Sequence, residues 1–333
     1  MDSNISIASC ARLCELNISV VTGSKQDKDA TSKVNEDNNA ADNVARVTKN
    51  IFAHSEMLPD IVKFAALVRQ EHLKLSLPFN DSGQRLIPNT MIQKHMEIMG
   101  KNKQEFLEKV EKFKEELPQL REHAEDCLGE LYNEYDYPSE EEVEVFISRK
   151  FRFNLEYPPV PESGGFLNGV LDDVKEDLDS MHNKAFDQKM KNATAEMWDR
   201  LVKCLQRLSL QLTDLTEDEV IEQQKIVDER AKAKNKKGRT VYPNKRIADT
   251  LLPSAMEICN ALEAFNITND PVLDKKRREL KVILSEHYNA KTDVFDLTRL
   301  KDKEVGAIYR NEMVEKVNEV KKSVDDITCK FGF

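Results

Sequence analysis

Apolar residues recur at helical spacing along one long stretch, from Phe166 to about Leu215. Steps of three and four residues keep one face of an α-helix apolar, and a one-residue shift of phase resembles a coiled-coil stutter. The apolar positions are Leu167, Leu171, Val174, Leu178, Met181 and Ala185, then Phe186, Met190, Ala193, Met197, Leu201, Cys204, Leu208, Leu212 and Leu215. No Gly or Pro interrupts Val170 to Glu219, so the pattern predicts one helix roughly 70 Å long.

Similar spacing predicts helices on both sides of this stretch. Before it, helices are expected over residues 5–16, in two segments between 44 and 75, and over 89–99, 101–132 (kinked at Pro118) and 139–148. Two of them carry stripes expected to be buried: Leu58, Ile61, Ala65 and Val68, and then Ile92, Met96 and Met99. After it, helices are expected over 244–265, 271–289 and 298–328. Heptad-like helices must bury their stripes on one another, which favours an antiparallel bundle.

Two short segments instead have the character of β-strands. Residues 17–22 are β-branched and end at Gly23, and in residues 150–157 apolar and polar side chains alternate. We expect them to pair as a small two- or three-stranded β element at one end of the bundle. The predicted fold is therefore mainly α: an elongated antiparallel bundle of long coiled-coil-like helices. Residues 1–165 form an N-terminal helical region with short strands, and 166–333 form the long-helix bundle, packed with the first region as one elongated unit.

Composition narrows the class of protein. The chain has 333 residues, 33% of them charged, and only ten glycines, which suits a solvated helical bundle better than a sheet-rich enzyme. A net charge of −10 argues against wholesale coating of nucleic acid. The six dispersed cysteines show no disulfide framework, and the first residues lack the basic and apolar runs of a signal peptide. No window approaches eighteen apolar residues, so we expect no membrane span and no membrane partner, and the dispersed cysteines favour a reducing cytoplasm.

Motifs for catalysis are missing from the sequence. It contains no Gly-rich phosphate loop and no H-E-x-x-H, and each of the six histidines is interpreted as a solvated or capped residue, with a metal ligand as the lesser alternative. Cys10 and Cys14 lie one helical turn apart, which is weak evidence for a metal because a site needs four ligands. Carboxylates such as Asp172-Asp173 are explained by solvated helix faces and helix starts. We therefore predict no catalytic residue, no metal, no cofactor and no enzymatic activity.

The most basic window runs from Lys225 to Arg246, with only Asp228 and Glu229 opposing it. Two interpretations stay open: a solvated loop between helices, or an arm that contacts phosphates, with one aromatic ring to stack on bases. The candidate phosphate-contacting residues are Arg230, Lys232, Lys234, Lys236, Lys237, Arg239, Tyr242, Lys245 and Arg246.

Two irregular stretches, Leu77–Asn89 and Tyr135–Ser139, also have two interpretations. They are turns that join helices and pack on the sheet, since Leu, Phe, Ile and Pro dominate them, or they form a docking surface. The candidate docking residues are Phe79, Asn80, Asp81, Arg85 and Tyr137.

Several irregular stretches together resemble one family, the phage and bacterial proteins grouped as domain of unknown function 3150. The matching pieces are Leu16-Asn17-Ile18-Ser19 with Gly23; Leu77-Pro78-Phe79 with Asp81, Gly83, Arg85-Leu86 and Pro88; Leu128-Gly129-Glu130-Leu131-Tyr132-Asn133 with Asp136-Tyr137-Pro138-Ser139; Pro159-Val160-Pro161 before Phe166; Trp198-Asp199-Arg200-Leu201; and Leu262 with Asn266 through Pro271. They span most of the chain in the expected order. Phe79 stands where many relatives have Trp, which is a departure.

The resemblance implies a non-catalytic partner protein. Members of this family look like companions of a MoxR-type AAA+ ATPase and a von Willebrand factor A protein. By that analogy the chain is a helical scaffold or adaptor acting through protein–protein interaction in the bacterial cytoplasm (the host's, if phage-encoded), with homo-oligomers open. The alternative is a nucleic-acid-binding protein of phage replication or recombination that uses residues 225–246.

Overall fold

The computed structural model describes residues 10–41, 44–80, 83–161, 172–233, 240, 247–266, 269–302 and 304–331. They fall into two compact units. The sheet unit is Ala11–Ser76 with Asn80–Val160, and the bundle unit is Leu77–Phe79 with Pro161–Phe333, to which Met1–Cys10 is also assigned. Each unit has its own core and is described by itself.

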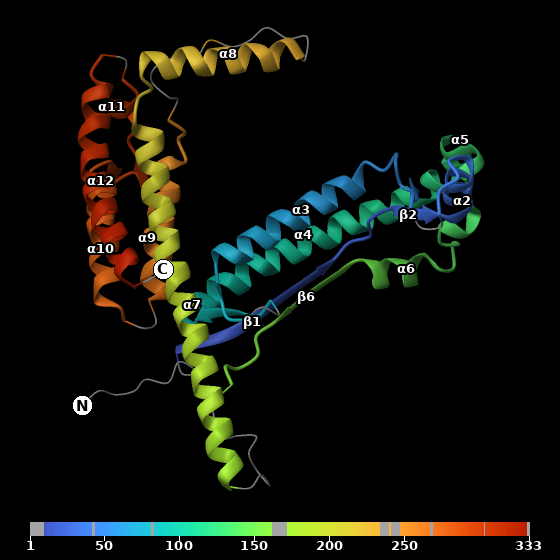
Figure 1. Ribbon diagram of the computed structural model, residues 1–333, viewed down its shortest axis with the longest axis horizontal. Coiled ribbons are helices and arrows are strands. Elements are labelled where there is room, and N and C mark those ends of the chain that lie inside the picture. Colours follow the sequence, from blue (N-terminus) through green and yellow to red (C-terminus); the bar gives the residue numbers. More distant parts are fainter. Residues whose placement is uncertain are drawn as a thin grey trace. The chain divides into compact units, whose positions relative to one another are not determined.

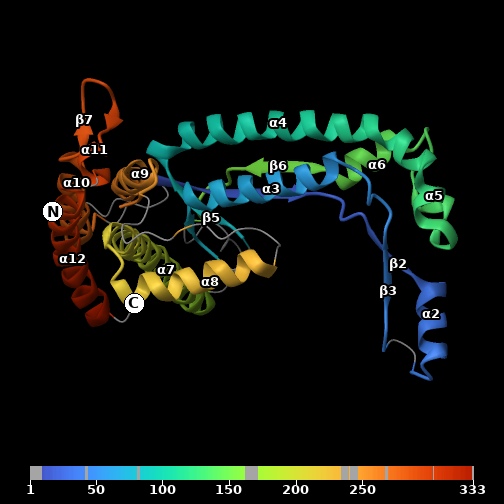
Figure 2. The same cartoon turned by 90° about the horizontal axis from the view of Figure 1, so that it is seen from above.

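In the sheet unit, two long helices lie side by side with two strands running along them (Figures 1 and 2). Its elements are β1 (Ala11–Ser19), β2 (Ser24–Asp27), α2 (Lys28–Asp37), β3 (Val47–Asn50), α3 (Met57–Lys74), β5 (Arg85–Pro88), α4 (Asn89–Glu122), α5 (Ala124–Leu128), the 3₁₀ turns η1 (Gly129–Leu131) and η2 (Glu134–Asp136), α6 (Val143–Lys150) and β6 (Arg152–Glu156). Helices α3 and α4 form the long pair, and β1 and β6 are the two strands. The two helices predicted over 89–99 and 101–132 are thus one helix that continues through Pro118 to Glu122, followed by the short α5.

The predicted pairing of the two strands is confirmed, but the sheet is larger than expected. Strand β1 pairs antiparallel with β6, placing Ile18 opposite Phe153. The full strand order is β4-β5-β1-β6, with β4 at Leu77–Pro78, so the sheet has four strands instead of two or three. The helix expected over residues 5–16 is wrong from Ala11 onward, because β1 pairs with β5 along Ala11–Cys14 and with β6 along Glu15–Ser19.

The core of the sheet unit is built on aromatic rings between the helix pair and the strands. Phe113 of α4 is fully buried, with its ring 5.4 Å from Phe52 and 5.3 Å from Phe151, the former edge-to-face. The predicted stripe of α3 is buried as expected: Leu58, Ile61, Ala65 and Val68. On α4, Met99 is buried as predicted, but Met96 is 53% exposed because the buried stripe runs one residue earlier than expected.

The bundle unit contains four helices packed in a ring, in which α7 contacts α9 and α12, and α10 contacts the same two helices (Figure 1). Its elements are α7 (Asp172–Leu212), α8 (Glu217–Ala233), α9 (Leu251–Phe265), α10 (Pro271–Ser285), β7 (Tyr288–Asn289), β8 (Val294–Phe295), α11 (Thr298–Lys301) and α12 (Gly306–Phe331). The stripe predicted for the long helix is buried from Met190 to Leu212. Upstream it is partly exposed: Val174 is 45% and Met181 67% exposed, whereas Leu178 and Phe186 are half-buried.

The prediction of one uninterrupted helix to Glu219 is wrong. Helix α7 ends at Leu212, and α8 begins at Glu217. The Thr216 hydroxyl and the Glu219 carboxylate are hydrogen-bonded at 3.0 Å, and the Thr216 amide donates to the same carboxylate at 2.8 Å. This is a capping box, which starts a new helix without any Gly or Pro. Asp214, in the break, binds the guanidinium of Arg310.

A mainly helical chain with small sheets is therefore confirmed. None of the helices in the described ranges has the length and apolar character needed to cross a bilayer. The predicted elongated coiled-coil bundle, with residues 1–165 and 166–333 packed as one unit, stays a prediction.

Candidate functional site

Three side chains suited to metal binding meet inside the sheet unit: Cys14, His72 and His95. One potential ligand atom from each lies within 4.8 Å of the other two. Cys14 and His95 are fully buried, and His72 is 5% exposed. Cys14 comes from the central strand β1, His72 from the last turns of α3 and His95 from the second turn of α4. The cluster therefore joins three elements that are separate in sequence.

A chain of hydrogen bonds fixes the two imidazoles. The Nδ1 atom of His72 lies 3.0 Å from Nε2 of His95, and Nδ1 of His95 lies 2.7 Å from the hydroxyl of Tyr157. A neutral imidazole carries one N–H and one acceptor nitrogen. If Tyr157 accepts from His95, then His72 donates to His95; if Tyr157 donates, the histidine bond reverses. In both arrangements a single proton lies between the two rings.

Ser76 and Arg85 complete the surroundings. The Ser76 hydroxyl donates to the carbonyl oxygen of His72 at 2.6 Å and accepts from Nε of Arg85 at 2.8 Å. Arg85, the first residue of β5, stands opposite Cys14 in the sheet register. The buried hydroxyl and the guanidinium are therefore held in place by backbone geometry.

Burial keeps the whole cluster uncharged at neutral pH. It lowers the pKa of His72 to about 4, helped by His95 and the Arg85 guanidinium, and lowers the pKa of His95 to about 4. Burial also raises the pKa of the Cys14 thiol to about 12, although Arg85 and a hydrogen bond with Ser76 oppose the shift. A thiol that stays protonated is a poor nucleophile, so the arrangement does not suit covalent catalysis.

The sequence interpretation of these histidines as solvated or capped residues is wrong for His72 and His95. A usable signal was present in the sequence. His72 continues the α3 stripe four residues after Val68, and His95 stands midway between the buried Met91 and Met99. A histidine in an apolar helical stripe is buried with it, and a buried histidine requires a polar partner.

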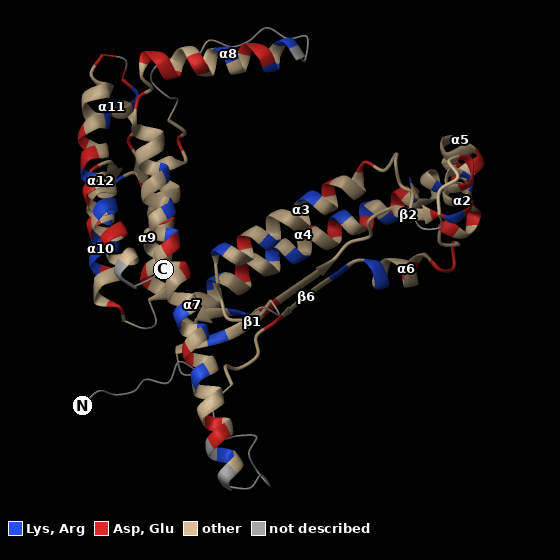
Figure 3. Cartoon of the chain, in the orientation of Figure 1, with Lys and Arg blue, Asp and Glu red and all other residues tan. Residues whose placement is uncertain are grey.

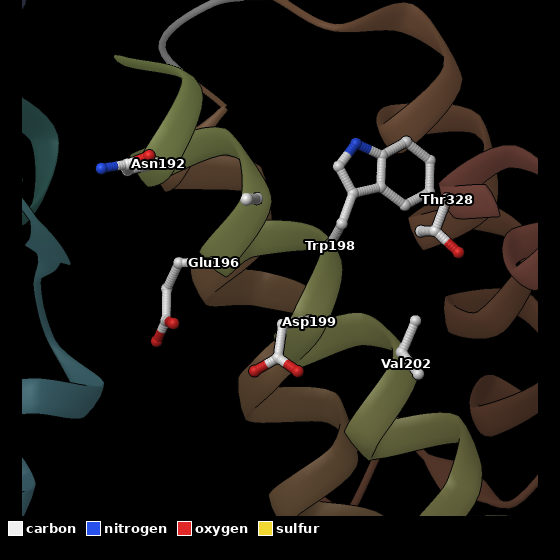
Figure 4. A pocket seen from close by; sticks show the side chains of 7 residues that line it. Asn192, Glu196, Trp198, Asp199, Val202 and Thr328 are labelled. Carbon is white, nitrogen blue, oxygen red and sulfur yellow. The ribbon is translucent and has the colours of Figure 1, made fainter. Parts of the chain in front are cut away.

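The polar side chains that line a shallow hollow in the bundle unit do not point toward a common centre (Figure 4). Its lining residues are Asn192, Ala195, Glu196, Trp198, Asp199, Val202 and Thr328. Glu196 binds Arg200 at 3.1 Å and Asp199 binds Lys203 at 2.6 Å, each one turn along the same helix. In Figure 4 neither carboxylate is directed at the Trp198 ring. Glu196 and Asp199 therefore each form an ion pair with a basic residue on the surface of their own helix.

The candidate docking residues are divided between the two units. In the bundle unit, Phe79 is 4% exposed and stacks edge-to-face on Phe186 at 6.4 Å. In the sheet unit, Tyr137 is 6% exposed and its hydroxyl donates to the carbonyl of Ile51 at 2.7 Å. Asn80 closes a turn with Gln84, Arg85 is bound to Ser76, and Asp81 lies outside the described residues. Docking by this set stays a prediction.

Only the start of the basic window is described. Arg230 and Lys232 are exposed in the last turn of α8, whose first turn is acidic (Figure 3). The remaining candidates lie outside the described residues: Lys234, Lys236, Lys237, Arg239, Tyr242, Lys245 and Arg246. Phosphate contact by this segment also stays a prediction.

A second buried network in the sheet unit is ionic. The ammonium of Lys49, whose side chain is 6% exposed, lies 2.9 Å from Asp136 and 3.0 Å from Asp27, and Lys25 also binds Asp136. Burial alone would raise the pKa of Asp136, but the bonds from Lys25 and Lys49 outweigh it and hold that pKa below 3.8. A backbone bond from Ala30, followed by the bond from Lys49, lowers the pKa of Asp27.

This network predicts a loss of stability in acid. An aspartate whose pKa is lower when folded stabilises the fold above its unfolded pKa, and the contribution disappears as the pH falls through the folded value. We therefore expect the urea midpoint of the sheet unit to drop as the pH falls below about 3.8. The variant Asp136→Asn should be less stable than wild type at neutral pH and should lose part of this dependence. An equal acid slope in wild type and Asp136→Asn would contradict the assignment.

Comparison with known proteins finds no match for this chain among family models, curated proteins or solved structures. The resemblance to the domain of unknown function 3150 family stays a prediction.

Proposed function

We propose that this protein is a non-catalytic helical adaptor that binds a MoxR-type AAA+ ATPase and works beside a von Willebrand factor A protein. The observation that carries the proposal is a heptad row at the start of α7, here called the α7 row: Val174, Leu178, Met181 and Ala185, of which Leu178 is half-buried and the other three are exposed among the described residues. Its steps of four, three and four residues are those of a coiled-coil seam. The row continues into a helix whose later part is buried in the bundle.

Exposure distinguishes this row from the rest of the helix. Val174 is 45% and Met181 67% exposed, whereas Met197, Leu201 and Leu205 are fully buried. An apolar seam about three turns long that is left in water is unfavourable, and such seams mark sites where another helix packs. The predicted elongated, coiled-coil-like architecture belongs to this proposal, since a partner helix on the row would extend the bundle.

The residues in and beside the α7 row indicate what kind of helix would pack on it. A partner helix must carry apolar residues at steps of three and four to interdigitate with Leu178 and Met181. Lys175, Asp177, His182 and Lys184 flank the row at the positions that set partner choice in coiled coils. We therefore expect the ATPase to contribute an amphipathic helix with acidic residues opposite the two lysines and a basic residue opposite Asp177.

A matched pair of substitutions tests the proposal. Met181→Glu and Leu210→Glu place the same charge at sites of equal character on one helix, 67% and 64% exposed. With purified full-length chain and the MoxR-type ATPase of the same organism, we expect Met181→Glu to weaken binding about tenfold or more, as loss of an interface anchor does. Leu210→Glu should bind like wild type. Calorimetry measures both affinities, and circular dichroism confirms that both variants fold.

Three results would overturn the proposal: no binding of the ATPase by wild type, equal losses in both variants, or self-association that Met181→Glu abolishes while the ATPase stays unbound. The last result would make the row an interface between copies of this chain.

The alternative function, nucleic-acid binding, is favoured by one observation, the exposed Arg230 and Lys232 at the end of α8. Under that alternative, the purified chain binds single-stranded DNA with an affinity that falls steeply with salt, because phosphate contacts release counterions. Charge reversal of Lys234, Lys236, Lys237 and Arg239 to Glu would then abolish DNA binding. Under the adaptor proposal the same reversal leaves ATPase binding unchanged.

A further inference from the structure

The structure points to a metal site inside the sheet unit: we propose that Cys14, His72 and His95 bind one zinc-class divalent cation. The inference is independent of the adaptor function, because it concerns residues of a different unit. Its ligands are one sulfur and two imidazole nitrogens, the donor atoms that zinc and cobalt prefer, and it includes no carboxylate of the kind favoured by calcium or magnesium.

The donor atoms are close to the spacing that a tetrahedral ion needs. Bonds of about 2.0–2.3 Å to nitrogen and sulfur place neighbouring donors roughly 3.3–3.6 Å apart. The three ligand atoms all lie within 4.8 Å of one another, and the two facing imidazole nitrogens of His72 and His95 are 3.0 Å apart. Side-chain movements of about 1 Å therefore complete the geometry.

Tyr157 supplies the outer partner that a ligating histidine requires. Metal-bound imidazoles almost always donate their second ring N–H to an oxygen, which fixes the ring orientation. The Tyr157 hydroxyl lies 2.7 Å from Nδ1 of His95, so in the metal-bound form Nδ1–H would donate to it and leave Nε2 to face the ion. Tyr157 follows directly after β6, so the orienting hydroxyl comes from a fourth element. It acts as a positioning residue.

The proton balance of binding follows from this geometry. Both imidazoles bind as neutral groups, so the proton shared between His72 and His95 moves to another ring nitrogen and is not lost. The Cys14 thiol loses its proton to form the metal–sulfur bond, because only a thiolate is a ligand. One proton is therefore released to solvent for each ion bound. Arg85, opposite Cys14, favours the thiolate but adds positive charge beside the site.

Burial determines what the ion would do. All three ligand residues are buried, so an ion here joins β1, α3 and α4 and contributes to stability. Three protein ligands leave a fourth position for water or a neighbouring hydroxyl. Ser76 is fully buried and is hydrogen-bonded to the backbone of His72, which places its hydroxyl beside the cluster.

Cobalt(II) is a suitable probe for this site, because its absorption spectrum depends on the ligands that bind it. Added to the metal-free full-length chain, it should bind with one equivalent per chain and produce a thiolate-to-cobalt charge-transfer band and intense tetrahedral d–d bands. Zinc should displace it, remove the bands and raise the melting temperature. Cys14→Ser should abolish the charge-transfer band. Cys259→Ser is the matched control, since Cys259 is equally buried in the bundle unit, and it should leave the band unchanged.

If Cys14→Ser does not fold, Tyr157→Phe still tests the proposal. It retains all three ligands and removes only the orienting hydroxyl, so the charge-transfer band should persist while cobalt affinity falls about 10–100-fold. Absence of the charge-transfer band in wild type, its survival in folded Cys14→Ser, or an unchanged affinity in Tyr157→Phe would each overturn the site.

Discussion

Replacing Phe113 by alanine should lower the free energy of unfolding of the sheet unit by about 3–5 kcal/mol. The ring is fully buried between helix α4 and the strands, where it contacts Phe52 edge-to-face and also lies against Phe151. The substitution removes this apolar surface, leaves a cavity and breaks two aromatic pairs, each of which adds about 0.5–1.5 kcal/mol beyond area burial.

Urea unfolding followed by far-UV circular dichroism measures this change. Leu107→Ala is the matched control, because Leu107 is on the same helix but 51% exposed, and its effect should stay within about 0.5 kcal/mol. Amide hydrogen exchange then locates the destabilisation, which should include β1 and α4. Equal effects of the two substitutions would contradict the placement of Phe113 at the centre of the core.

Replacing Asp214 by alanine should destabilise the bundle unit by about 3–5 kcal/mol, because it leaves a buried charge without its partner. Arg310 is 4% exposed and donates to both oxygens of Asp214, at 2.9 and 2.7 Å, and to the carbonyl of Leu300 at 2.7 Å. A Cβ added at Gly306 would lie 2.7 Å from Nη1 of the same guanidinium, so the guanidinium packs closely against the backbone of Gly306.

The single tryptophan of the chain reports this loss. Trp198 is 2% exposed in the core of the bundle unit, so its fluorescence follows unfolding of that unit. Asp249→Ala is the control: Asp249 also forms an ion pair, with Lys301, but its side chain is 89% exposed, and exposed pairs contribute little. A wild-type midpoint for Asp214→Ala would show that water can solvate Arg310 in place of the carboxylate.

The buried face of a helix could be predicted from sequence wherever all the residues of its buried stripe are apolar. The α3 stripe from Leu58 to Val68 and the α7 stripe from Met190 to Leu212 are both buried as expected. The stripe of α4 was displaced by one residue, since His95 was counted as polar while it occupies a buried position. A hydrogen-bonded neutral imidazole behaves as a core residue, which periodicity does not indicate.

The Cys14–His72–His95 cluster could not be assembled from sequence spacing. The sequence pattern predicts a helix for Cys14, with Cys10 as its nearest sulfur ligand, but the pairing of Ala11–Cys14 with β5 places it on a strand. His72 and His95 are brought together by the packing of α3 on α4, because nothing in their 23-residue separation encodes it. Ligand sets drawn from several elements depend on tertiary contacts.

The sequence by itself determined that the chain is mainly helical, which faces of α3 and α7 are apolar and that residues 150–157 have the character of a strand, because periodicity and alternation are local properties. Tertiary structure alone decided where the long helix ends, which half of its stripe is covered and which polar side chains meet in the core. Those outcomes depend on contacts between residues distant in sequence, such as Asp214 with Arg310 and His95 with Tyr157. A local pattern shows that a surface must be buried, but only the assembled fold shows what buries it.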